Sequence, residues 1–174
     1  MFQAVEIVSP TLNKVASRFR AGCGNFESIF FRPTKPSPYY PNYPDLSQGE
    51  AVVLMGVLGS EFLRASIPEL FPLDLGSARK FSLLNRFEFE GSLIHLLLQG
   101  TCTDKVVASE SEARETVCAL LAETILGRDN SLWALRMDDW NWSELTRSAT
   151  LSGTYFVYAP IDKTWWFIGF ADHY

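Results

Sequence analysis

The chain has 174 residues, of which 47% are hydrophobic and 20% charged, and its formal net charge is −5. This composition is globular and excludes a disordered chain, and the length suits a single domain, residues 1–174. The longest apolar run, residues 51–58, is far shorter than the roughly 20 residues of a membrane-spanning helix. The start has no basic segment followed by an apolar run, so we expect no secretory signal, no membrane contact and a cytoplasmic location.

The charged residues are unevenly distributed along the chain. Residues 1–40 hold five basic and two acidic side chains, whereas residues 86–145 hold five basic and eleven acidic ones. Binding to nucleic acid needs a basic surface that neutralises phosphates, so this balance argues against a nucleic-acid partner. An acidic surface suits a basic protein partner, although a solvated acidic face without any partner fits the charge equally well.

Two helices are predicted in the first part of the chain. Ser9 is an N-cap followed by proline, and apolar residues then recur at helical spacing as far as the next glycine. Ser47, with Glu50 three residues later, has the pattern of a capping box for a second, largely buried helix. Between the two helices, residues 25–32 favour a short strand, and residues 33–45, with five prolines, must be extended and irregular.

The middle of the chain contains one ambiguous segment and one clear helix. Phe87 and Phe89 alternate with glutamates, which favours a strand interrupted at Gly91, and the short apolar run that follows fits either a helix or a strand. Ser109 can cap a helix while Glu112 reaches back to complete a capping box. The apolar residues that line one face of this helix are Ala113, Val117, Leu120 and Leu121.

The last third of the chain is rich in strand-forming residues. Residues 131–138, 153–160 and 163–172 are predicted to be antiparallel strands, and the sequence PIDK joins the last two in a type I turn with proline at its second position. The predicted fold class is therefore α+β, with an antiparallel sheet formed largely by the C-terminal third and packed against three to four helices.

No residue pattern identifies a reaction, a metal site or a cofactor site. His95 lies in an apolar run, and His173 is the penultimate residue. The three cysteines are widely spaced without a CxxC motif, so we expect reduced and mostly buried thiols. Asp138 and Asp139 are adjacent, and adjacent side chains on a strand point to opposite faces rather than toward one ion. We therefore expect a protein that is not an enzyme and needs no metal or cofactor.

The stretch MDDWNWSEL, residues 137–145, combines aromatic and acidic side chains as protein interfaces do. Its candidate partner-binding residues are Asp138, Asp139, Trp140, Trp142 and Glu144. If the segment is extended, the two tryptophans share one face, and core packing is the alternative role for at least one of them.

Tyr39, Tyr40 and Tyr43 form a second candidate surface on the proline-rich segment. Proline stiffens this segment, so it would lose little entropy on binding a partner. The alternative is that the tyrosines attach a long loop to the domain. The sequence favours neither role, and Tyr39 and Tyr40 remain candidate binding residues.

The last 89 residues have a characteristic order: FEFEGSLIHLLLQG, an amphipathic helix, DDWNW, and TYFVYAPIDKTWWFIGFADHY with its closing Asp172. This order resembles small acidic bacterial immunity proteins that protect against secreted polymorphic or contact-dependent toxins. The resemblance implies a protein that binds and neutralises a cognate toxin, with a nuclease as the expected target. It also implies that the acidic residues, including Asp172, contact a basic surface of that toxin.

Two alternatives remain open at this point. One is a secretion chaperone or adaptor, which would also bind a protein partner. The other is a small enzyme with a dispersed polar site, which an enclosed pocket holding His95 together with carboxylates would favour. A gene for a larger secreted toxin immediately upstream would favour immunity.

Overall fold

The computed structural model describes residues 2–22, 24–34, 49–124 and 130–173. Its centre is an antiparallel sheet of six strands in the order β1-β2-β6-β5-β4-β3. The strands are β1 (Phe2–Ala4), β2 (Asn25–Pro33), β3 (Phe81–Asn85), β4 (Trp133–Met137), β5 (Leu151–Ala159) and β6 (Thr164–Asp172). Three of these strands, β4 to β6, come from the C-terminal third, so the predicted α+β class is confirmed.

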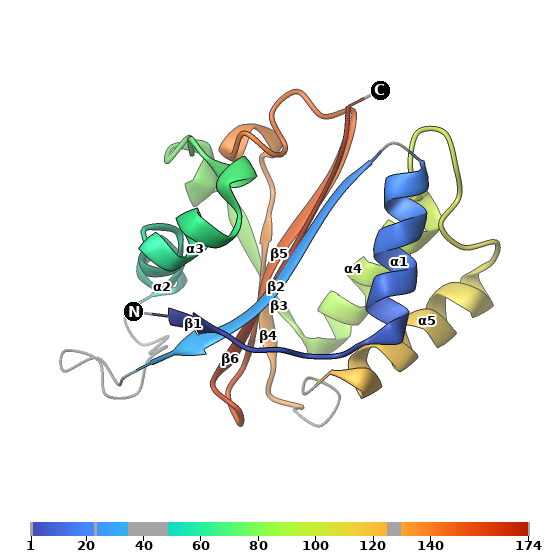
Figure 1. Ribbon diagram of the computed structural model, residues 1–174, viewed down its shortest axis with the longest axis horizontal. Helices are drawn as coiled ribbons and strands as arrows, with labels where there is room; N and C mark the ends of the chain where they lie inside the picture. Colours follow the sequence, from blue (N-terminus) through green and yellow to red (C-terminus); the bar gives the residue numbers. More distant parts are fainter. Residues whose placement is uncertain (1, 23, 35–48, 125–129, 174) are drawn as a thin grey trace.

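Helices cover both faces of the sheet (Figure 1). They are α1 (Pro10–Ala21), α2 (Glu50–Leu58), α3 (Glu61–Ser66), α4 (Arg86–Gln99) and α5 (Glu110–Glu123). Helices α1, α4 and α5 lie on one face, and α2 and α3 lie on the other. Four of the five have nine residues or more, against the three to four that the sequence predicts.

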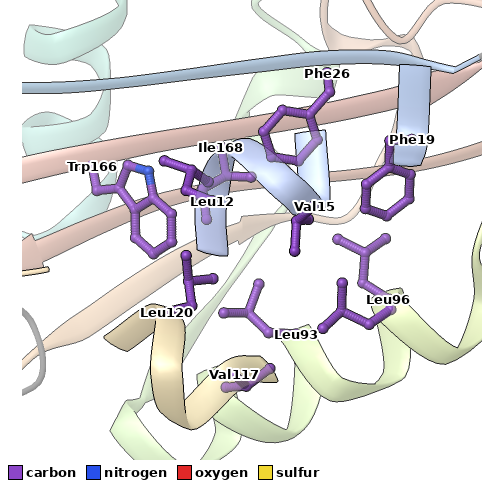
Figure 2. Close-up of a pocket in the computed structure, with 11 residues that line it drawn as sticks. Leu12, Val15, Phe19, Phe26, Leu93, Leu96, Val117, Leu120, Trp166 and Ile168 are labelled. Carbon is purple, nitrogen blue, oxygen red and sulfur yellow. The ribbon is translucent and has the colours of Figure 1, made fainter. Parts of the chain in front are cut away.

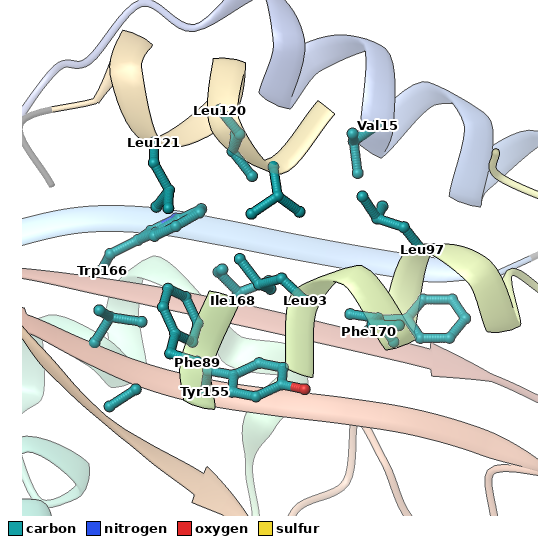
Figure 3. Close-up of a cluster of buried hydrophobic side chains, with 14 of the residues drawn as sticks. Val15, Phe89, Leu93, Leu97, Leu120, Leu121, Tyr155, Trp166, Ile168 and Phe170 are labelled. Carbon is teal, nitrogen blue, oxygen red and sulfur yellow. The ribbon is translucent and has the colours of Figure 1, made fainter. Parts of the chain in front are cut away.

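Each face of the sheet has its own hydrophobic core. On β6, Trp166, Ile168 and Phe170 face α1, α4 and α5, whereas Trp165 and Phe167 face α2 and α3. Figure 3 shows the first of these cores, in which the ring of Trp166 lies among side chains from the helices. Every residue of β6 is buried. A strand that is buried on both faces needs apolar residues at successive positions, which explains the sequence TWWFIGFA.

The segment that begins at Phe87 is a helix, so its predicted strand is wrong. Asn85 is the N-cap of α4: its side chain accepts a hydrogen bond from the backbone N–H of Glu88, and the Glu88 carboxylate accepts one from the backbone N–H of Asn85. This capping box sets a helical period in which Phe89 and Leu93 face the core. Phe87 falls outside that face and is 80% exposed.

The helix caps confirm part of the prediction. Ser9 caps α1, and Ser109 caps α5 by accepting from the N–H of Glu112. The Glu112 carboxylate does not complete a capping box, because it accepts from the N–H of Ala108 and pairs with Arg18 instead. Helix α2 begins after Gly49, at a φ of 90°. Ser47, Tyr39, Tyr40 and Tyr43 lie outside the described residues.

Candidate functional site

The acidic and aromatic stretch forms a corner of the molecule at the end of β4. The chain leaves β4 at Met137, makes the 3₁₀ turn η5 (Trp140–Trp142), and contacts a second 3₁₀ turn, η3 (Ser77–Arg79), that precedes β3. We call this surface the Asp138 corner. It comprises Asp138, Asp139, Trp140 and Glu144, together with the basic residues Lys80, Arg136 and Arg147.

Each carboxylate of the Asp138 corner has a basic partner within the chain. The Nζ of Lys80 lies 2.8 Å from Oδ2 of Asp139, and Nη2 of Arg136 lies 3.2 Å from Oδ1 of Asp138. Glu144 and Arg147 pair at 2.9 Å. The net charge of the folded corner is therefore less negative than the run of acidic residues in the sequence indicates. Surface ion pairs of this kind contribute little to stability because solvent screens them, so a partner can compete for them.

Asp139 has a structural role in addition to its position on the surface. Its carboxylate accepts a hydrogen bond from the backbone N–H of Asn141 and thereby caps η5. The hydrogen bond from Lys80, followed by that from Asn141 and one from the Ser77 hydroxyl, lowers the pKa of Asp139 to about 2. Asp139 therefore holds Trp140 in a fixed turn.

The lowered pKa of Asp139 predicts a specific loss of stability in acid. Since the folded pKa lies below the unfolded value of about 3.9, the carboxylate stabilises the fold above that value. Its contribution should disappear as the pH falls from about 4 through about 2. In Asp139→Asn, urea unfolding should show a smaller decrease of stability over this interval. Lys80→Met should raise the pKa of Asp139 in a carboxyl NMR titration, and an unchanged pKa would contradict the assigned cause.

The two tryptophans of the stretch have opposite environments. Trp142 is 1% exposed and packs against Phe156 in the core beneath α2 and α3, with ring centroids 6.0 Å apart. Trp140 is 42% exposed. Trp142 is therefore a core residue in this structure, not a surface anchor, whereas Trp140 is accessible to a partner.

Asp172 is also buried, at 2% exposure, and so is not accessible to a partner in this structure. Its Oδ2 accepts a hydrogen bond from the backbone N–H of Cys102 at 2.6 Å. Desolvation, followed by a hydrogen bond between the thiol and the Asp172 carboxylate and by the charge of that carboxylate, raises the pKa of the Cys102 thiol, which disfavours the reactive thiolate. Cys102 and Cys118 are both exposed, so the expectation of mostly buried thiols is wrong for these two.

The uneven charge along the sequence is partly explained by contacts within the chain. Six ion pairs between described residues use a carboxylate from residues 86–145. Three of these carboxylates pair with bases from outside that segment: Arg18, Lys80 and Arg147. Arg18 on α1 joins Glu112 on α5 at 3.0 Å, so the basic N-terminal region neutralises part of the acidic region.

The three cavities described near the larger core include no enclosed polar pocket. A cavity of about 20 Å³ between α1, α4, α5 and the sheet has only apolar side chains in its lining (Figure 2). Such a space stays dry because a buried water needs polar partners. Two open grooves, of about 240 and 580 Å³, run beside the Arg18–Glu112 pair. None of these three spaces is lined by a histidine, and His95 is exposed on α4.

The described residues offer no metal site as an alternative to the Asp138 corner. Within the described ranges, no three side chains of His, Cys, Asp or Glu are grouped so that they could hold a metal ion. Every helix in the described part of the chain is too short or too polar to cross a bilayer. No family model, curated protein or solved structure matches the chain. The Asp138 corner is the candidate site because it brings an exposed tryptophan together with charged side chains.

Proposed function

We propose that the chain is an immunity protein that binds and neutralises a secreted toxin in the cytoplasm, and that the Asp138 corner contacts the toxin. The observation that carries this proposal is the accessible ring of Trp140 on a turn that Asp139 and Lys80 hold in place. An aromatic side chain on a capped turn, surrounded by charged groups, has the composition of an interface hot spot, because its backbone loses little conformational entropy when the ring is covered.

The net negative charge of the chain supports a partner with a basic surface, because it attracts such a partner at long range. The chain carries a net charge of −5, and such a field accelerates encounter with a basic protein. At contact distance the paired charges of the corner contribute mainly to specificity, since each carboxylate already has a partner. A nuclease toxin fits this pattern because nucleases present basic surfaces to nucleic acid.

Cell protection tests the proposed function directly. The product of the gene immediately upstream should arrest growth when it is expressed alone, and co-expression of this chain should restore growth. A chaperone or adaptor would bind that product without abolishing its toxicity. A harmless upstream product, or a toxic one that this chain binds but does not neutralise, would contradict immunity.

Association kinetics test the role of the corner. Glu144→Lys should slow association with the toxin, and the effect should shrink at high salt, because charges at the rim of an interface steer the encounter. Glu115→Lys is the matched control: it makes the same change in net charge at an exposed position of α5, in the other helical layer. Equal association rates for the two variants would show that Glu144 does not lie in the interface with the toxin.

A further inference from the structure

Strand β3 forms one edge of the sheet and has backbone hydrogen-bonding groups that are unused among the described residues. The N–H of Asp138 donates to the carbonyl of Lys80 at 2.9 Å, so Lys80 and Asp138 are a hydrogen-bonded pair at the end of the β3–β4 ladder. In an antiparallel ladder, every second residue of β3 from Lys80 onward is then hydrogen-bonded to β4. Ser82 and Leu84 therefore direct their backbone groups toward β4, whereas Phe81 and Leu83 direct theirs away from it. Within the described residues, no hydrogen bond is made to the N–H or C=O of Phe81 or Leu83.

This edge lacks the features that usually prevent strand pairing. Residues 81–85, FSLLN, contain no proline and no charge, and Leu83 is 44% exposed. The opposite edge, β1, has only three residues. A row of outward N–H and C=O groups at strand spacing is complementary to another extended backbone, and β3 is therefore suited to accept a further strand.

The two ends of β3 carry opposite charges. At the C-terminal end, Oε2 of Glu88 accepts a hydrogen bond from the N–H of Asn85, the next outward-facing amide, at 2.8 Å. The Glu88 carboxylate therefore lies at the edge itself. At the N-terminal end, Arg79 is exposed and forms no ion pair with another described residue.

We propose that two copies of this chain form a dimer by antiparallel pairing of their β3 strands about a two-fold axis at Ser82. In this register Phe81 of each copy lies opposite Leu83 of the other. The N–H and C=O groups of Phe81 and Leu83 in each strand are then paired, and the exposed Leu83 side chains are covered. It also places Arg79 opposite Asn85 of the second copy, where the Glu88 carboxylate lies. Opposite charges meet at both ends of the pair.

The charge order identifies a second copy as the occupant. An edge that is basic at one end and acidic at the other is complementary to itself when the strands run antiparallel, and closed two-fold dimers are the commonest oligomers. The hydroxyl of Ser82 donates to Asp138 at 2.7 Å, so the Asp138 corner borders this interface in each subunit. The dimer is independent of the proposed function.

Sedimentation equilibrium over a range of concentrations tests the dimer. The full chain should dimerise reversibly, and Leu83→Lys should raise the dissociation constant at least about tenfold, because it places two unpaired charges in the interface. Val8→Lys is the matched control, since Val8 is 76% exposed and lies outside β3. A chain that stays monomeric up to millimolar concentration, or a dimer that Leu83→Lys leaves intact, would overturn the proposal.

A charge exchange provides a second test that does not depend on Leu83. Arg79→Glu should weaken the dimer by placing two carboxylates opposite each other at both ends of the pair. Adding Glu88→Lys to the same chain should restore dimerisation, because the charges are then opposite again. Equal dimerisation of wild type and Arg79→Glu, or no recovery in the folded double variant, would exclude the proposed register.

Discussion

Trp142→Ala should lower the free energy of unfolding by about 3 to 5 kcal/mol, the usual loss for a large aromatic residue in a core. Trp142 is 1% exposed and contacts Phe156 from the central strand β5. Its backbone carbonyl also accepts a hydrogen bond from the N–H of Asp74, so the turn around it is tied to a neighbouring segment. Removal of the indole leaves a cavity that this turn cannot close.

The matched control is Trp140→Ala, which should change stability by no more than about 0.5 kcal/mol, as exposed substitutions usually do. Trp142→Phe should cost far less than Trp142→Ala, because the indole Nε1 has no hydrogen-bond partner among the described residues. Urea unfolding followed by circular dichroism measures all three variants. Equal losses for Trp140→Ala and Trp142→Ala would show that the placement of η5 is wrong.

Leu121→Ala should cost about 2 to 5 kcal/mol, because it removes a large side chain from the inward face of α5. Leu121 is 3% exposed and lies in the core that α1, α4 and α5 form on the sheet (Figure 3). The control is Ser109→Ala, which removes the hydrogen bond to the N–H of Glu112 and should cost about 1 kcal/mol. If denaturant unfolding ranks these two variants in the reverse order, the inward face of α5 is assigned wrongly.

The parts of the fold that were predictable carry strong local signals. Helix α5 has a serine cap and a full helical period, and the apolar runs of β5 and β6 suit strands buried on both faces. The error at α4 arose because Phe87 and Phe89 alternate with glutamates over only four residues. One of these glutamates, Glu88, belongs to the capping box with Asn85. Strand β3 was not predicted because its five residues, FSLLN, are too few to show a clear alternation of apolar and polar side chains.

The sequence located the candidate site but could not show which of its residues are buried and which are exposed. Trp140 and Trp142 share a face only in an extended segment; in a 3₁₀ turn, with three residues per turn, they point in different directions. Counting charges also overestimated the acidity of the corner. The base that neutralises Asp139 is Lys80, which is 59 residues away in sequence, and no local pattern indicates this pairing.

The dissociation rate of the complex with the upstream gene product tests most directly whether the Asp138 corner is the docking surface. Trp140→Ala should dissociate at least about tenfold faster than wild type, because truncation of a central aromatic anchor acts mainly on dissociation. Val8→Lys should dissociate at the wild-type rate. If Trp140→Ala is folded and dissociates as slowly as wild type, the exposed tryptophan is not an anchor and the corner is not the docking surface.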